Sequence, residues 1–249
     1  MMNENKLVSS TLQLADSALI LGQRNAAWCA HGPILEQDIA ITNITLDLIG
    51  QARNFYQYAA KLMNEADNKN ETEDTLAYFR NERDFKNYLI CELPNGDWAQ
   101  TILRQFFLST FQSLLFEKMM QSSDTQLAAI ATKSIKEIQY HLKWSSEWVI
   151  RLGDGTEESR NRILAAVDYL WMYTGEFFIP AAYEIFNAAD LQQDWLHHVA
   201  IVFEEATIPF PAENQFMQTG GKTGMHTEHL GFIIAEMQSL QRAYPGAEW

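Results

Sequence analysis

Residues 34–62, ILEQDIAITNITLDLIGQARNFYQYAAKL, carry the pattern that decides the fold. A seam of mostly apolar side chains recurs in this stretch at alternating spacings of four and three residues, at positions 34, 38, 41, 45, 48, 52, 55, 59 and 62. Such spacing is typical of a helix that packs against other helices in a bundle. A second seam of the same kind runs from Ala131 to Leu152. Both stretches predict long, packed helices.

Helix breakers are rare in the chain. Only six prolines are present, and none lies between Ile34 and Leu93 or between Asn95 and Ile179. The sequence therefore predicts an all-α protein: a ferritin-like four-helix bundle with additional C-terminal helices, in a single domain spanning residues 1–249. We expect the bundle helices at about 6–29, 34–65, 98–121 and 124–152, a short helical stretch before Cys91, and further helices at about 156–187, 191–206 and 225–242.

The composition restricts the classes of partner and compartment. The 249 residues carry a formal net charge of -14 and are 47% hydrophobic, which indicates a folded protein that repels nucleic acids and anionic membranes. No apolar run approaches the roughly 20 residues that cross a bilayer, and no secretory signal is visible. We expect a cytoplasmic protein in which Cys29 and Cys91 are reduced thiols.

The expected fold often holds two metal ions, and this sequence lacks the ligands for them. Such bundles use a Glu from each of two helices and a Glu-x-x-His from each of two others, yet no Glu-x-x-His occurs in the chain. Glu137 and His141 are one turn apart and share a face with Ser134 and Trp144. Tyr140 occupies the position three after Glu137, and His141 is rotated from it by about 100° in an ideal helix.

The second bundle helix also lacks a histidine at the position expected for a metal ligand. Its matching segment has Asp47 as the acid and Gly50 where an imidazole would be. Because His141 is the one plausible interior His of the first four helices, we predict no intact metal site. Asp16, Asp47, Glu137 and His141 are instead predicted to form a buried polar network, which needs neutralising partners. Our hypothesis is that guanidinium groups of Arg24, Arg53 or Arg104 replace the charge of the absent iron.

Two features near the C-terminus leave alternatives open. The segment 219–224, TGGKTG, superficially resembles a phosphate loop but lacks the preceding Gly and strand of that motif. It is either a plain connection or an anion contact through Lys222 and main-chain N–H groups. The cluster of His226, Glu228 and His229 could share a metal, although placement on the surface at a helix start is the commoner arrangement. Asp194 and His197 are interpreted as a solvated or interface pair.

Several separated segments, in order along nearly the whole chain, resemble one family. They are 47–54 (DLIGQARN), 94–97 (PNGD), 136–141 (KEIQYH), 219–222 (TGGK), 226–231 (HTEHLG) and 245–249 (PGAEW). Together they are similar to the C subunits of bacterial phenylacetyl-CoA epoxidases.

The resemblance implies a function. In that family a sister subunit holds the di-iron centre that epoxidises the ring of phenylacetyl-CoA, and a reductase supplies electrons from NADPH. The C subunit is a structural partner without iron ligands, so we expect no cofactor in this chain. The degenerate positions Asp47, Gly50, Glu137, Tyr140 and His141 agree with that role, and Lys222 is a candidate contact for the CoA portion or another anion.

Two other functions compete with this expectation. The first is an active di-iron oxygenase with an atypical ligand set drawn from Asp16, Asp47, Glu137 and His141. The second is a helical module that binds an unrelated protein. Self-association of the chain is open in each case, and the expected partner of the leading interpretation is the di-iron catalytic subunit.

Overall fold

The computed structural model describes residues 2–68, 70–212 and 215–247, with side chains from residue 5 onward. Its regular elements within these ranges are helices, and none is a strand. The contacts divide the chain into two compact units: unit 1 comprises residues 1–94, 181–185 and 220–249, and unit 2 comprises residues 95–180 and 186–219. The single domain predicted for residues 1–249 stays a prediction. The predicted 245–249 ending lies partly outside the described residues.

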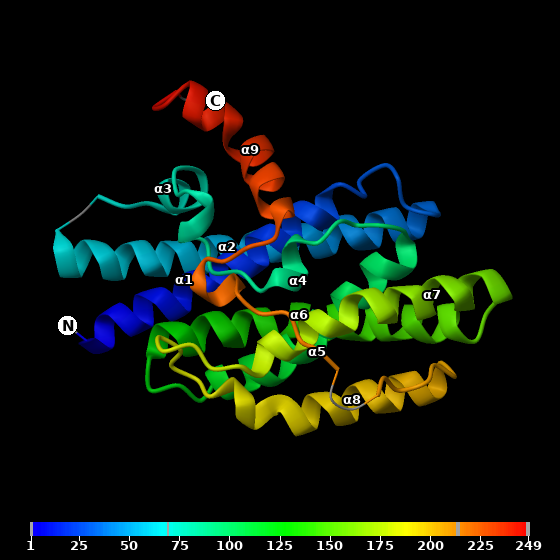
Figure 1. Cartoon of the computed structure of the whole chain (residues 1–249). Coiled ribbons are helices and arrows are strands. Elements are labelled where there is room, and N and C mark those ends of the chain that lie inside the picture. Colours follow the sequence, from blue (N-terminus) through cyan, green and yellow to red (C-terminus); the bar gives the residue numbers. More distant parts are fainter. Residues whose placement is uncertain (1, 69, 213–214, 248–249) are drawn as a thin grey trace. The chain divides into compact units, whose positions relative to one another are not determined.

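Unit 1 is built on a pair of long helices. Helix α1 (Met2–Ala26) and helix α2 (Leu35–Asp67) pack along each other and run in opposite directions (Figure 1). The seam predicted in residues 34–62 supplies the buried side of α2, including Ile41, Leu48 and Phe55. Helix α2 ends where Asn68 adopts a left-handed conformation with φ of 52°.

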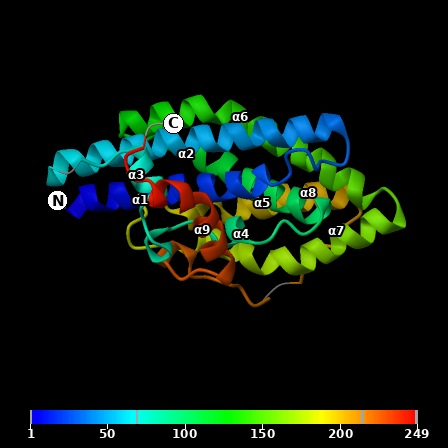
Figure 2. The same ribbon diagram turned by 90° about the horizontal axis from the view of Figure 1, so that it is seen from above.

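Shorter elements cover the helix pair of unit 1. They are α3 (Glu73–Tyr78), a 3-10 turn at Glu82–Asp84, α4 (Leu89–Glu92) and the C-terminal helix α9 (Glu228–Ala243), which contacts α3 and α4 (Figure 2). The stretch before Cys91 is thus only partly helical, because residues 85–88 are irregular. The predicted start of the last helix at residue 225 is three residues early, because Thr227 caps it through a hydrogen bond from His229 N.

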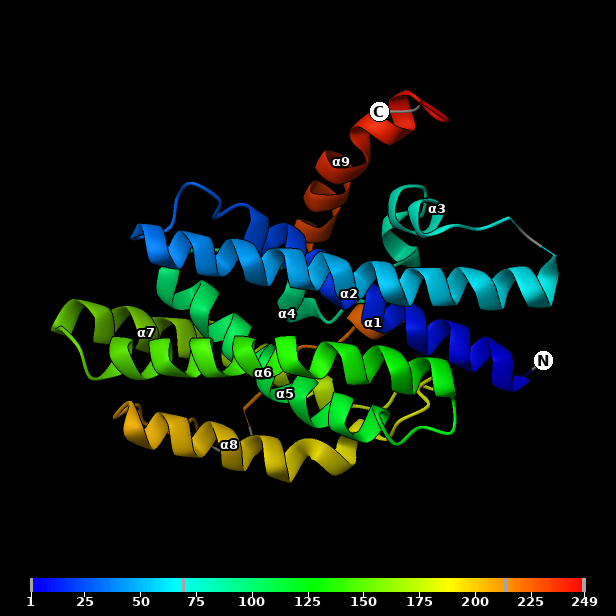
Figure 3. The ribbon, with the colours of Figure 1, turned by 180° about the vertical axis from the view of Figure 1, so that it is seen from behind.

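Unit 2 is built around helix α5 (Trp98–Met119), whose residues 101–113 are all buried. It packs against α6 (Thr125–Gly153), α7 (Glu157–Leu170) and α8 (Gln192–Glu205), and Figure 3 shows α6 and α8 beside it. Asp124 caps α6 by accepting hydrogen bonds from Gln126 N and Leu127 N at 3.1 and 2.9 Å.

One predicted helix of unit 2 is wrong. The stretch 156–187 is helical only to Leu170; Trp171–Phe178 forms a 3-10 helix, and the chain is then irregular to residue 187. Its aromatic side chains, with Phe107, Phe111 and Trp195, form the aromatic core of unit 2. Gly175 lies where an added Cβ would be 2.6 Å from the Met217 side chain, so this part of the chain is shaped by close packing rather than by helical periodicity.

Candidate functional site: a buried charge network

A fully buried acid of unit 1 is Asp16, in the middle of α1. Its side chain is 0% exposed, and its helical neighbours Leu12, Ala15, Leu19 and Ile20 are core residues. An isolated carboxylate in such surroundings is strongly unfavourable, so the environment must supply donors or a cation.

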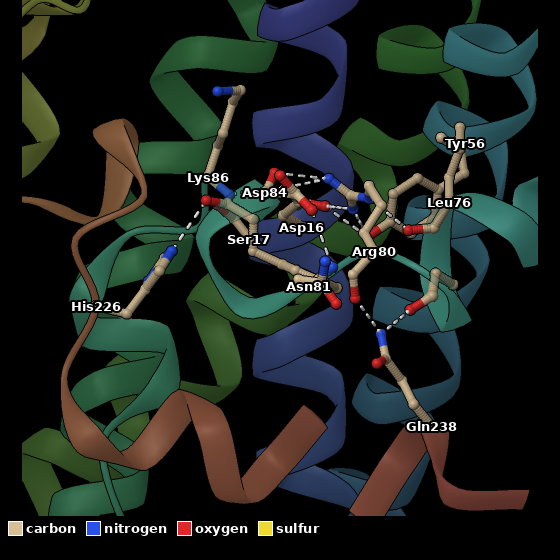
Figure 4. A network of polar contacts seen from close by, with 12 residues as sticks. Asp16, Ser17, Tyr56, Leu76, Arg80, Asn81, Asp84, Lys86, His226 and Gln238 are labelled. Atoms are coloured by element: carbon tan, nitrogen blue, oxygen red, sulfur yellow. Dashed lines mark hydrogen bonds and ion pairs between the residues drawn. The ribbon is translucent and has the colours of Figure 1, made fainter. Parts of the chain in front are cut away.

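Three residues saturate the Asp16 carboxylate (Figure 4). The Tyr56 hydroxyl donates to Oδ1 at 2.6 Å, and the main-chain N of Lys86 donates to Oδ2 at 2.8 Å. The Arg80 guanidinium contacts both oxygens, with a distance of 3.2 Å from Nη1 to Oδ2. Burial, and next the charge of Asp16, raise the pKa of Tyr56 well above its ordinary value, so the phenol remains a donor.

Arg80 connects this carboxylate to the loop after α3. Its guanidinium also donates to the Asp84 carbonyl at 3.0 Å and lies 4.3 Å from the centroid of the Phe85 ring. The carbonyl of Arg80 accepts hydrogen bonds from Gln238 at 3.1 Å and from Arg242 at 2.8 Å, both on α9. The buried charge on α1 therefore organises a segment that in turn holds the C-terminal helix.

The hypothesis of a neutralising guanidinium is right for Asp16 but names the wrong residue, and its other part, that the guanidinium replaces the charge of iron, stays a prediction. The cation is that of Arg80, which none of the sequence patterns singled out, rather than that of Arg24, Arg53 or Arg104. Arg24 donates to the Glu92 carbonyl at 2.6 Å, Arg53 pairs with Glu73 at 3.3 Å, and Arg104 binds the side-chain oxygen of Asn95 at 2.5 Å. Arg80 lies in a polar loop, and no periodicity or motif in the sequence indicates that it has a buried partner. The approach of this loop to α1 depends on tertiary folding.

A second buried acid, Glu92 of α4, binds the segment before α9. Its carboxylate accepts from His226 Nδ1 at 2.8 Å, from Thr227 N at 2.6 Å and from Asn87 Nδ2 at 2.8 Å. The His226 and Glu92 side chains are 0% exposed. The surface placement expected for His226 is therefore wrong. Glu228, in contrast, is exposed at the start of α9.

A third buried contact involves Lys222. Its Nζ lies 2.7 Å from Glu184 Oε1, in a pair whose side chains are 5% and 8% exposed, and 5.2 Å from the centroid of the Tyr88 ring. The predicted contact of Lys222 with CoA or another anion stays a prediction, and an anion would have to displace Glu184 to make it.

Close contacts of the main chain explain why glycines flank Lys222 in the TGGKTG segment. A Cβ on Gly221 would lie 2.2 Å from the Asn87 carbonyl oxygen, and one on Gly224, where φ is +77°, would lie 2.3 Å from that of Arg83. Glycine at these positions lets the C-terminal segment approach residues 83–89 closely. Residues 220–224 of this segment are thus a packing element of unit 1.

The predicted degenerate metal positions lie on two helices, one in each unit. On α2, Asp47 is half-buried, and Gly50 is exposed with no atom within 4 Å of an added Cβ. On α6, His141 is buried, Glu137 is half-buried, and Tyr140 is 46% exposed with its ring 6.2 Å from that of His141. Their assignment as degenerate metal positions stays a prediction. Asp194 and His197 are both exposed on α8.

The observed donor set around Asp16 does not fit iron. Both oxygens of this carboxylate are engaged by protein donors, and one donor is a permanent cation that would repel a metal ion. In the described ranges, no three His, Cys, Asp or Glu side chains gather as a group able to hold a metal ion. The chemistry of the network is therefore charge neutralisation and positioning of the chain.

Comparisons with known proteins agree with the resemblance of the sequence segments. A family model described as phenylacetic acid catabolic protein matches residues 1–249. The chain is 46% identical to the C subunit of the 1,2-phenylacetyl-CoA epoxidase of Escherichia coli strain K12, over 98% of this chain and 100% of that protein. With the helical structure, this match confirms the predicted fold class, all-α and ferritin-like. No helix in the described part of the chain is long and apolar enough to span a membrane.

Proposed function

Since this chain belongs to the phenylacetic acid catabolic protein family, we propose that it is a structural subunit of a phenylacetyl-CoA epoxidase. In this proposal the chain has no catalytic centre of its own and supports a partner subunit that carries the di-iron site. The observation that supports the proposal is the Asp16 network, where Arg80 and Tyr56 occupy a carboxylate that belongs to the atypical ligand set of the alternative oxygenase. The reductase then serves the catalytic subunit, and the complex acts in the cytoplasm.

A structural subunit needs an exposed surface for its partner, and α2 offers one. We name the exposed face of α2 the α2 stripe; it consists of Leu35, Ile39, Leu46 and Ile49, which are 72%, 52%, 61% and 37% exposed. In an ideal helix these four positions fall within about 80° of one another around the axis. Apolar side chains aligned in this way are typical of a helix that docks against another protein.

The α2 stripe has two features that suit packing against a helical partner. Gly50 lies on the same side of the helix, and its open space permits close approach of another backbone. A pocket of about 270 Å³ also adjoins the stripe, because Ile49 is part of its lining together with Leu19, Tyr56 and Tyr78. A pocket of that size beside an apolar ridge accommodates a side chain inserted from a facing helix. We infer that the di-iron subunit docks here.

Replacing Leu46 with Glu is expected to weaken binding of the di-iron subunit by about thirtyfold or more, because a carboxylate would be buried where an apolar contact is needed. The stability of the isolated chain should change little, since Leu46 is 61% exposed. The measurement is titration calorimetry of the two purified subunits. The matched control is Phe232→Glu on α9, where the side chain is 73% exposed. Equal loss in both variants would contradict docking on the α2 stripe.

The iron content of the chain tests the second part of the proposal, that the chain has no catalytic centre of its own. The chain purified alone is expected to contain far less than one iron per molecule and to epoxidise no thioester, because its buried acids are neutralised by protein groups. Asp47→Ala should lower stability without changing metal content. Co-expression with the di-iron subunit should restore activity to the complex. Two irons per chain and oxygenation by the lone subunit would favour the alternative, an active oxygenase with an atypical ligand set.

A further inference from the structure

The His226 ring has an acceptor at each of its two nitrogens. Nδ1 lies 2.8 Å from Glu92 Oε2, and Nε2 lies 2.9 Å from the Phe85 carbonyl oxygen. A carbonyl oxygen only accepts hydrogen bonds, and an ionised carboxylate does the same. A neutral imidazole has one N–H and would satisfy only one of these contacts, whereas the imidazolium satisfies both.

This ring joins two parts of unit 1 that are distant in sequence. We name residues 220–243 the C-terminal arm; it contains the packed glycine segment and α9. His226 and the adjacent Thr227 N anchor the start of this arm to Glu92 of α4. Figure 4 shows His226 directed at the chain beside Lys86. At the other end of α9, Gln238 and Arg242 bind main-chain carbonyls of the loop after α3.

We propose that His226 is a proton-dependent latch, which holds the C-terminal arm against residues 85–92 while its ring is doubly protonated and releases the start of the arm when the ring loses a proton. The inference does not rest on the proposed function. It rests on the two acceptors and on a side chain that is 0% exposed, because water cannot replace a hydrogen bond broken there unless the arm opens.

The surrounding charges favour the closed, protonated state. Although burial alone lowers the pKa of His226, its hydrogen bond to Glu92 and the charge of Glu92 outweigh that effect, and Phe85 and Asp16 add to them, so the pKa is raised above 6.5. The neighbouring segments carry several charged or titratable groups: Asp16 and Arg24 of α1, Glu82, Arg83 and Asp84 of the 3-10 turn, Lys86, Glu92 of α4, the Lys222–Glu184 pair, and Glu228 and His229 of the arm.

The sign of the pH dependence follows from this shift. The closed arm binds the proton more tightly than the open arm. The hydrogen bonds of His226 therefore stabilise the closed arm fully at pH values below the open-state pKa of about 6.5, and this stabilisation is lost as the pH rises through the raised pKa of the closed state. Between these two values, the equilibrium constant for opening should rise about tenfold per pH unit. Acidification below this window should not open the arm through His226.

Hydrogen exchange of the full chain tests the latch. Amide exchange rates from residue 226 into the first turns of α9 are measured between about pH 6 and pH 10 and divided by the intrinsic rates for each pH. We expect protection in the wild type to fall as the pH rises from 6.5 and to level off above the pKa of His226 in the closed state. His226→Gln should abolish that fall and leave the arm less protected at the lower pH. The matched control, His229→Gln on the same helix, should behave like the wild type.

A second measurement, titration of the His226 ring in the wild-type chain, tests the proposal even if His226→Gln does not fold. Histidine-selective NMR of the wild-type chain should give His226 a pKa above 6.5 that matches the midpoint of the exchange change. Glu92→Gln should move both to lower pH, since it removes the negative charge next to the ring. A wild-type pKa below 6.5, or protection of α9 that is independent of pH, would overturn the proposal.

Discussion

Replacement of Arg80 by Met is expected to lower the free energy of unfolding by roughly 3 to 5 kcal/mol, the usual cost of leaving one member of a buried ion pair without its partner. Asp16 is 0% exposed and Arg80 is 13% exposed, so little solvent reaches the carboxylate when the guanidinium is removed. Part of the loss should appear in α9, because the carbonyl of Arg80 binds Gln238 and Arg242. Urea denaturation followed by tryptophan fluorescence and by circular dichroism measures the change.

Arg53→Met is the matched control for this prediction. Arg53 is 68% exposed and pairs with Glu73 on the surface, where the loss of an ion pair costs less than about 1 kcal/mol. A second variant, Asp16→Leu with Arg80→Met, removes both charges and should recover part of the stability. If Arg80→Met is no more costly than Arg53→Met, Asp16 is not the organising charge of unit 1.

Glu184→Leu should be similarly damaging, because it leaves the Lys222 ammonium buried without its carboxylate. The two side chains are 5% and 8% exposed, and the expected loss is roughly 3 to 5 kcal/mol. The double variant Glu184→Leu with Lys222→Met should be more stable than Glu184→Leu alone, since no unpaired charge remains. A double-mutant cycle from denaturation curves gives the coupling free energy of the pair.

The exposed pair of Lys118 and Asp190 provides the comparison. Its side chains are 38% and 56% exposed at a distance of 3.0 Å, so the corresponding cycle should give a coupling below about 1 kcal/mol. Equal coupling in the two cycles would show that the Lys222 pair is solvated, and that Lys222 remains accessible to an external anion. Strong coupling in the Lys222–Glu184 cycle alone would indicate a purely structural role for residues 219–224.

Helices with regular apolar seams could be predicted well from the sequence. Helix α2 begins within one residue of the predicted start, and α6 begins directly after Asp124, because periodicity and capping are encoded locally. The stretch after Leu170 could not be predicted in this way. There an aromatic run is buried by side chains from α5 and α8, and its conformation follows the shape of that core.

The candidate site likewise has residues that the sequence indicated and partners that it did not. The sequence singled out Asp16 as a buried acid in need of a cation, since a helix that is apolar around a carboxylate cannot leave it unpaired. It did not identify Arg80, which is 64 residues away in the chain. His226 and Lys222 were found as chemically conspicuous residues, but their partners Glu92 and Glu184 come from other segments.

By itself the sequence determined the helical class, the family and the shortage of imidazole ligands, because periodicity, motif order and residue type are properties of the chain alone. Only the tertiary structure decided which cation neutralises Asp16, why the glycines of residues 219–224 are needed, and that His226 is covered rather than exposed. The physical reason is that burial and pairing of charges depend on contacts between residues far apart in sequence, and no local pattern records those contacts.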